Sequence, residues 1–232
     1  MIALHRVADV SLPVDPGPLD WEVENKGAID AHWARAVARN PALFDGRVHM
    51  ATDVSVQGGR LTALCVPVRF ASFLRWRDTG YPGPAMRLAF GFAATTASDG
   101  ALLLGRMADH TANPNRVYFP GGVIDESDCS DGCLDAEGNI RRELAEECGL
   151  DTDQISLRPG FLVVETPVEL AVGRVADMPW PATEARDRLL ESIEARGDGE
   201  LVDIIAVGCG ADTEGLDLAP YARAVIDWTF PP

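Results

Sequence analysis

Apolar and polar positions alternate with a period of two along several segments of the chain, which is typical of half-buried strands. The alternation over residues 46–70 is interrupted by Gly58 and Gly59, and this predicts a β-hairpin. A second hairpin is predicted where residues 87–96 and 100–107 flank a short polar turn. Strands are also predicted within residues 115–124, 156–176 and 200–209.

A helical period appears in other segments. Ile29, Trp33 and Val37 recur every four residues, which predicts a helix within residues 24–44. Further helices are predicted within residues 71–80, 139–150, 182–197 and 218–228. Strands and helices therefore mix without regular βαβ alternation, which indicates an α+β (mixed α/β) fold class. The break "YPGPAM" predicts an N-terminal α/β extension over 1–85 and a second domain over 86–232.

Composition narrows the range of functions. Hydrophobic residues form 47% of the 232 positions, enough for a packed core. The formal net charge of −16 argues against nucleic acid, because phosphate binding requires a basic surface. The sequence shows neither a signal peptide nor an apolar run of membrane-spanning length, so we expect no membrane partner. The five scattered cysteines are typical of reduced thiols, and we expect a cytoplasmic protein.

The stretch "RRELAEECGL" places three carboxylates on one side of a predicted helix. Glu143, Glu146 and Glu147 are spaced i, i+3 and i+4, where like charges repel. They also lie towards the helix C-terminus, the unfavourable end for negative charge, because Gly149 fits the residue that ends the helix. A divalent cation with a preference for oxygen ligands would turn this repulsion into binding.

Other interpretations of these acidic residues remain to be weighed. An isolated acidic run most often faces water. Against that, Gly121 and Gly122 follow a predicted strand, and glycines allow a close approach of the backbone to a ligand. An EF-hand fails because no glycine in "DESDCSDGCLDAEG" places a glutamate at the bidentate position, so we expect that segment to be a solvated insertion. Cys129 and Cys133 lack partner ligands for zinc.

These residues resemble the box of the Nudix hydrolase family, G-x5-E-x7-R-E-U-x-E-E-x-G-U, where U is apolar. Residues 142–150 match its second half fully, and "FPGG" matches its start with Gly122 as the box glycine. Two departures follow: Asp128 stands where the first box glutamate belongs, and thirteen residues rather than seven separate it from Arg142. Fainter similarities point to UDP-sugar pyrophosphatases and to coenzyme A diphosphatases of the family.

The resemblance implies the Nudix fold, a mixed sheet sandwiched between helices, with the box as loop–helix–loop. It further implies a Mg2+-dependent hydrolase, with Mn2+ as a substitute, that cleaves the pyrophosphate bond of a nucleoside diphosphate linked to another moiety. UDP-sugars, ADP-ribose and coenzyme A are the candidate types, and a homodimer is a possible state. The alternative is a catalytically weak Nudix-fold binding or sensor module for a nucleotide, because the first half of the box is altered.

The resemblance also assigns roles to residues. Glu146 and Glu147 would be the main metal ligands, with Glu143 as a further ligand or as the group that orients or deprotonates water. Arg142 would hold a box carboxylate, here Asp128. The remaining candidates are the carbonyl of Gly121 as a metal ligand, Glu200 as catalytic base with Glu165 second, and Arg106, Arg116 and Gly122 as substrate contacts.

Overall fold

The computed structural model describes residues 1–111, 113–149, 154–197 and 200–231. The helices other than α1 follow the predicted segments closely. They are α1 (Asp20–Glu24), α2 (Lys26–Arg39), α3 (Phe70–Asp78), α4 (Ala136–Cys148), α5 (Ala182–Arg196) and α6 (Pro220–Thr229). The strands are β1 (Ala3–Val7), β2 (Asp9–Ser11), β3 (Arg47–Gln57), β4 (Arg60–Arg69), β5 (Arg87–Thr96), β6 (Leu102–Met107), β7 (Val117–Tyr118), β8 (Gly121–Val123), β9 (Cys129–Ser130), β10 (Cys133–Leu134), β11 (Ser156–Leu157), β12 (Phe161–Glu165), β13 (Glu169–Asp177) and β14 (Leu201–Val207).

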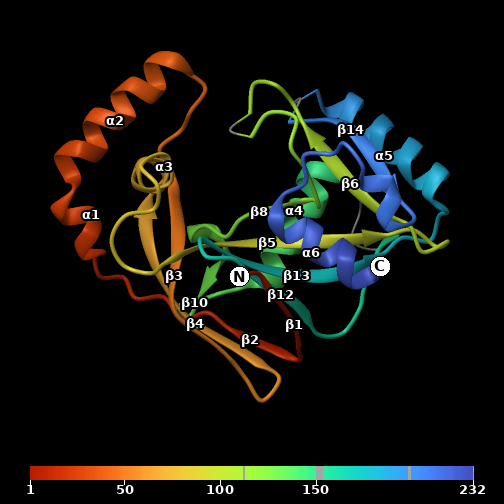
Figure 1. The fold of residues 1–232 in the computed structure, drawn as a ribbon, viewed down its shortest axis with the longest axis horizontal. Helices are drawn as coiled ribbons and strands as arrows, with labels where there is room; N and C mark the ends of the chain where they lie inside the picture. The colour runs from red at the N-terminus through yellow and green to blue at the C-terminus, as the bar shows by residue number, and fades with distance from the viewer. Residues whose placement is uncertain (112, 150–153, 198–199, 232) are drawn as a thin grey trace.

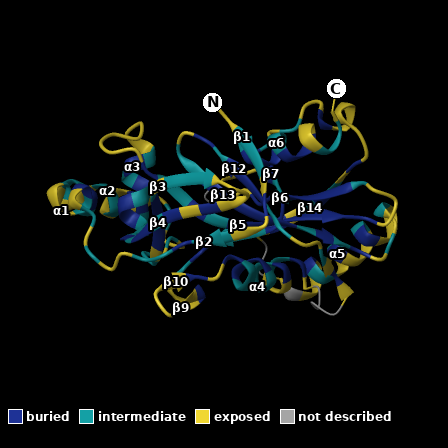
Figure 2. Ribbon diagram, turned by 90° about the horizontal axis from the view of Figure 1, so that it is seen from below, coloured by how far each residue is buried: buried dark blue, intermediate teal, exposed yellow. Residues whose placement is uncertain are grey.

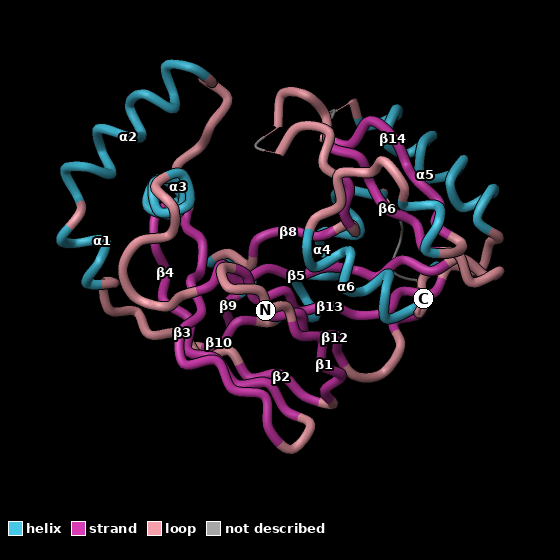
Figure 3. The backbone as a smooth tube through the Cα atoms, in the orientation of Figure 1, coloured by secondary structure: helices cyan, strands magenta, loops and turns pink. Residues whose placement is uncertain are grey.

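Most strands join one mixed sheet, ordered β1-β12-β13-β5-β3-β4-β2, to which the remaining strands other than β9 and β10 are attached. Its centre is the parallel pair of β13 and β5, which run side by side across the molecule (Figure 3). β8 pairs antiparallel with β5 and places Gly122 opposite Gly91. The hairpin predicted at Gly58 and Gly59 is confirmed, since both glycines adopt positive φ between β3 and β4.

Helices cover both faces of the central sheet. Ile140 and Leu144 of α4 pack with α5 against Ala93 of β5, on one face. The apolar side of α6 packs against Phe92 on the other face, because successive residues of a strand point to opposite sides. Figure 2 shows α4 and α5 on one side of the sheet and α6 on the other. The predicted α+β fold class, a mixed sheet between helices, is confirmed.

The segment before residue 86 shares the sheet with the segment after it. β1 pairs antiparallel with β12, and β3 pairs with β5 through Met50 opposite Leu88. Helices α1, α2 and α3 pack on the β3–β4 hairpin and form an arm beside the rest of the molecule (Figure 1). A division into two domains at residue 85 stays a prediction, although hydrogen bonds of one sheet cross that point.

The acidic insertion before α4 folds as a small hairpin rather than as an unpaired solvated loop. β9 and β10 pair antiparallel around a turn in which Asp131 and Gly132 have positive φ. The hairpin is exposed at its tip but hydrogen-bonded to the N-terminal segment, through Val14 N–H to Gly132 O and Leu134 N–H to Leu12 O. The insertion is exposed over most of its length, as expected, and in addition an N-terminal segment distant in sequence supplies partners for its backbone.

Candidate active site

Arg142 organises the acidic face of α4. Its guanidinium donates two hydrogen bonds to Asp128, from Nη2 to Oδ2 at 2.9 Å and from Nε to Oδ1 at 3.3 Å. Its Nη1 lies 2.9 Å from Glu143 Oε1 and 3.0 Å from Glu146 Oε2. The hydrogen bond to Asp128, with help from the neighbouring carboxylates, raises the pKa of Arg142 further. One cation is thus shared by three carboxylates and offsets part of their mutual repulsion.

Asp128 reaches Arg142 because the β9–β10 hairpin returns the chain to the start of α4. The N–H of Asp135 donates to the carbonyl of Asp128 at 2.8 Å, and the Asp135 side chain then caps the helix at Gly138 N–H. Asp128 also accepts from Asn139 Nδ2 at 2.9 Å and leaves only 5% of its side chain exposed. The six extra residues therefore close a loop and leave the carboxylate next to the arginine.

Glu143 lies beneath the Gly-Gly strand. A Cβ on Gly122 would lie 2.4 Å from its carboxyl carbon, so only glycine permits this approach. Burial raises the pKa of Glu143 to about 7, with Arg142 opposing the rise and Glu146 and Asp128 adding to it. A carboxyl that titrates near neutrality suits proton transfer in a hydrolase.

Glu147 and Glu146 complete the face in different ways. Oε2 of Glu147 accepts from the N–H of Gly121 at 2.9 Å, which ties the C-terminal part of α4 to β8. The structure therefore brings Gly121 to the acidic helix through its N–H, whereas the sequence had suggested its carbonyl as a ligand. Glu146 is more open, with 59% of its side chain exposed.

The chemistry of the donor set fits a magnesium ion, although the side chains do not converge on one. Within the residues that the structure describes, no three acidic, His or Cys side chains form a group that would hold a metal ion. Arg142 contacts both Glu143 and Glu146 and supplies the positive charge there. Carboxylate oxygens are nevertheless the hard ligands that magnesium prefers, and Glu143, Glu146 and Glu147 all come from one helical face.

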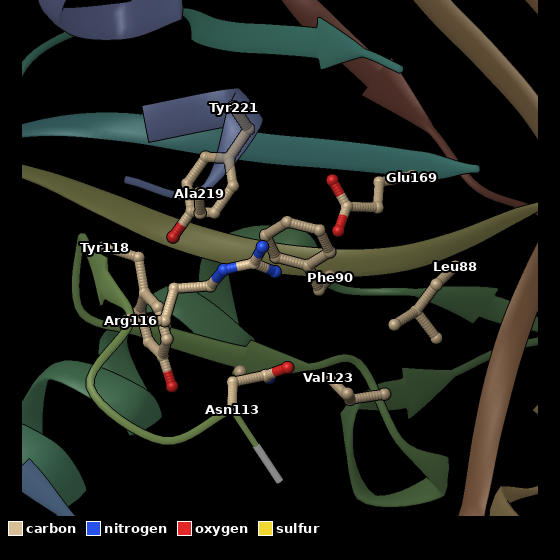
Figure 4. Close-up of a pocket in the computed structure, with 11 residues that line it drawn as sticks. Leu88, Phe90, Asn113, Arg116, Tyr118, Val123, Glu169, Ala219 and Tyr221 are labelled. Atoms are coloured by element: carbon tan, nitrogen blue, oxygen red, sulfur yellow. The ribbon is translucent and has the colours of Figure 1, made fainter. Parts of the chain in front are cut away.

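A pocket opens on the other side of the Gly-Gly strand (Figure 4). It encloses about 150 Å3, less than the roughly 300 Å3 at the lower end of ligand clefts. The side chains of Arg116 and Glu169 point into it. Its lining consists of Leu88, Phe90, Asn113, Arg116, Tyr118, Gly121, Gly122, Val123, Glu169, Ala219 and Tyr221.

The candidate substrate contacts and bases from the sequence fall in different places. Arg116 and Gly122 line the pocket, whereas Arg106 lies on β6 opposite Asp203 and is not part of the lining. Glu200 lines a separate cavity of about 400 Å3. Glu165 lies on β12, where its carboxylate is 3.4 Å from His5 Nε2 and 3.7 Å from Arg87 Nη2, and it is not part of the pocket lining.

Two residues of this region were missed from the sequence. Glu169 begins β13. It lies four residues after Glu165, the residue that the sequence suggested as a second candidate for the catalytic base. Tyr118 is shared by the pocket and by the cavity that contains Glu200. Burial raises the pKa of Tyr118, and the charges of Glu147 and Glu200 add to the rise. The only sequence signal for Glu169 was a charged residue at the start of an otherwise apolar strand.

Comparisons with known proteins give a resemblance at the level of structure. No family model matches the chain, and no curated protein matches it. Solved structures do match, 62 chains in all. A Nudix hydrolase from M. smegmatis, RenU, is 17% identical with a TM-score of 0.38, and the match covers 59% of this chain and 79% of that one.

Two further matches are similar in extent. The MutT protein from Methanosarcina mazei Go1 is 17% identical with a TM-score of 0.40, over 61% of this chain and 91% of that one. NrtR from Shewanella oneidensis is 18% identical with a TM-score of 0.40, over 62% of each chain. The chain therefore resembles Nudix hydrolases at low identity.

Among the described residues, no helix is long and apolar enough to cross a membrane.

Proposed function

We propose that this protein is a magnesium-dependent pyrophosphohydrolase that cleaves a nucleoside diphosphate linked to another moiety. The observation that carries the proposal is the acidic face of α4, held by Arg142 and Asp128 against a Gly-Gly strand that also lines a pocket. A structural helix would gain nothing from three crowded glutamates, because their mutual repulsion and their place near the helix C-terminus both oppose folding.

The proposed roles follow from the contacts. Glu143, Glu146 and Glu147 would hold magnesium, which supplies charge neutralisation and polarisation of the phosphoryl oxygens when bound. Arg142 fixes the carboxylates through its grip on Asp128 and so sets their spacing. Glu143 is the proposed acceptor of a proton from the attacking water, with Glu200 as the alternative.

The chain's own residues must also position the substrate. At a net charge of −16 the protein repels a diphosphate at long range, so binding requires cations close to the site. Arg116 supplies one such charge from the pocket. Gly121 and Gly122 lie between this pocket and the acidic helix, so a diphosphate held along them would have its linkage beside Glu143 and Glu147. In the hydrolysis, the oxygen of water forms a new bond to one phosphorus, the bond from that phosphorus to the bridging oxygen breaks, and the bridging oxygen leaves with the other phosphate, which gives two phosphorylated products.

The test is a hydrolysis panel of UDP-sugars, GDP-sugars, ADP-ribose, dinucleotides, coenzyme A and nucleoside triphosphates, each with magnesium or with chelator. We expect turnover of at least one diphosphate with magnesium and none with chelator. Glu146→Gln should lower kcat by about 100-fold or more, because a group that stabilises charge in the transition state contributes on that scale.

Glu184→Gln is the matched control. Like Glu146, Glu184 is an exposed helical glutamate paired with an arginine one turn away, at 2.8 Å from Arg188, but it lies on α5. Its substitution should leave kcat unchanged. Retained nucleotide binding with no hydrolysis of any panel member by folded parent protein would refute the enzyme and support the binding or sensor module instead.

A further inference from the structure

The carboxylate of Glu169 is unusual among the groups that line the pocket. Burial raises its pKa, while Arg116 and the Thr166 hydroxyl oppose the rise. Its Oε2 is buried and has no hydrogen-bond partner within the described part of the chain. An unpaired buried carboxylate oxygen is costly, so a structure that keeps one beside a pocket points to donors that arrive with a ligand.

Arg116 offers the opposite hydrogen-bonding character in the same pocket. Figure 4 shows its guanidinium pointing into the pocket towards the side of Glu169. Among the residues that the structure describes, none forms a hydrogen bond or an ion pair with this guanidinium, although its charge acts on Glu169. The pocket therefore holds the donor fork of Arg116 and one carboxylate oxygen, Glu169 Oε2, and within the described residues neither has a hydrogen-bond partner.

Aromatic rings form the walls between these two groups. Phe90 and Tyr221 meet edge to face, with ring centroids 4.9 Å apart, and Tyr118 lines the pocket as well. The hydroxyl of Tyr221 is already committed to the carbonyl of Phe119 at 3.1 Å, so its apolar ring is what remains for a ligand. Aromatic faces favour a flat ring, and base–aromatic stacking is a recurrent mode of nucleotide binding. The volume of about 150 Å3 suits a single ring system rather than a whole nucleotide.

We propose that this pocket selects guanine as the base of the substrate, with Glu169 as the specificity-determining residue. Guanine presents two adjacent N–H donors, N1–H and the exocyclic amine, with no acceptor between them, and a carboxylate can accept from both. Its O6 and N7 are the acceptors that arginine recognises. Adenine, cytosine and uracil each place an acceptor next to their donor, which a carboxylate repels.

The inference rests on the proposed function for its substrate but not for its test. Gly121 and Gly122 line the pocket and also contact the acidic helix, through Glu147 and Glu143 respectively. A guanine in the pocket would therefore have its diphosphate next to the proposed catalytic carboxylates. The substrate would be a guanosine diphosphate linked to a second moiety.

The experiment measures binding rather than turnover. GMP, AMP, UMP and CMP are titrated into the full-length protein in the presence of chelator, and dissociation constants are obtained by calorimetry. Repulsion from the acidic protein affects the four ligands alike, so their ratios report on the base. We expect GMP to bind about tenfold to a hundredfold more tightly than the other three, on the scale of one bidentate base contact.

Glu169→Gln tests the residue. The amide keeps the shape but puts a donor where the carboxylate had an acceptor, so the GMP preference should fall by about tenfold or more and shift towards AMP. Glu165→Gln is the matched control. Glu165 lies four residues before Glu169, next to His5 and Arg87, and it is not part of the pocket lining. That variant should keep the parental preference.

The outcomes separate this inference from the proposed function. AMP, UMP or CMP binding as tightly as GMP to the parent, or no binding of any of the four at millimolar concentration, overturns guanine selection without any variant. A GMP preference that survives in folded Glu169→Gln protein also overturns it. Preferential GMP binding without hydrolysis would refute the proposed enzyme and leave the guanine assignment standing. Hydrolysis with no base preference would support the enzyme and refute the guanine assignment.

Discussion

Replacing Glu143 by glutamine removes a carboxyl whose ionisation the folded protein opposes. The side chain is 12% exposed, and burial raises its pKa from the usual 4.5 to about 7. A tenfold change in proton affinity corresponds to about 1.4 kcal/mol, so the difference between folded and unfolded chain amounts to about 3 kcal/mol. Because the side chain is mostly shielded from water, little of this is lost to solvent screening.

The direction of the stability change depends on whether the folded or the unfolded chain holds the proton of Glu143. Below about pH 4.5 the carboxyl is protonated in both states, and its contribution to stability is fully present. Between 4.5 and about 7 the unfolded chain loses the proton first, so stability falls as the pH rises, and above about 7 the loss is complete. Glutamine is neutral throughout, so Glu143→Gln should gain stability relative to the parent across this window, by about 3 kcal/mol at pH 8.

Urea unfolding followed by tryptophan fluorescence, with chelator present, measures this difference at pH 5, 6, 7 and 8. A stability difference between variant and parent that does not change with pH would refute the reasoning, as would a variant that becomes less stable as the pH rises. Glu184→Gln serves as the control, because its exposed ion pair with Arg188 predicts a change below about 1 kcal/mol.

Two further substitutions test the geometry of the site. Gly122→Ala places a Cβ 2.4 Å from the Glu143 carboxyl carbon, and the displaced carboxylate should lower kcat/KM by about 100-fold, measured on the best substrate of the hydrolysis panel. Asp128→Ala leaves Arg142 without its two-bond partner and removes one of the two acceptors of Asn139 Nδ2, and it should lower the free energy of unfolding by roughly 3 kcal/mol in urea titrations.

Each of these two substitutions has a control, which is the same substitution at an exposed position. A Cβ at Gly210 would meet nothing within 4 Å, so Gly210→Ala should keep parental kcat/KM. Asp177 also receives two bonds from one arginine, Arg158, but at the surface, so Asp177→Ala should cost about 1 kcal/mol or less. Equal rates for Gly122→Ala and Gly210→Ala would contradict the close approach seen at Glu143. An equal loss of unfolding free energy in Asp128→Ala and Asp177→Ala would contradict the importance of burial.

Much of the fold was predictable because its signals are local. The β3–β4 turn needed two residues with positive φ and the sequence supplied Gly58 and Gly59. Helix α4 ends where Gly149 takes a left-handed conformation. The spacing of Glu143 and Glu147 along that helix predicted a shared face, which the structure reproduces by turning both towards β8. Such features depend on a few neighbouring residues, and chain connectivity alone fixes them.

The partners of those residues depend on contacts between distant segments. Nothing near Asp128 in the sequence indicates that a hairpin paired with residues 12–14 returns it to Arg142. Likewise, β1 joins β12 across more than 150 positions. Strand order and register of this kind are decided by burial of whole faces, which no local pattern encodes.

The sequence by itself determined the acidic helix, the Gly-Gly strand before it and the class of chemistry that they favour. Only the tertiary structure decided that Arg116 on the loop before β7 and Glu169 at the start of β13 share a pocket with Tyr221 of α6. The physical reason is that a charged side chain at a strand end looks the same in sequence whether it faces water or a cavity. Packing of three separate elements around the sheet makes the difference, and it leaves Glu169 Oε2 without a hydrogen-bond partner among the residues that the structure describes.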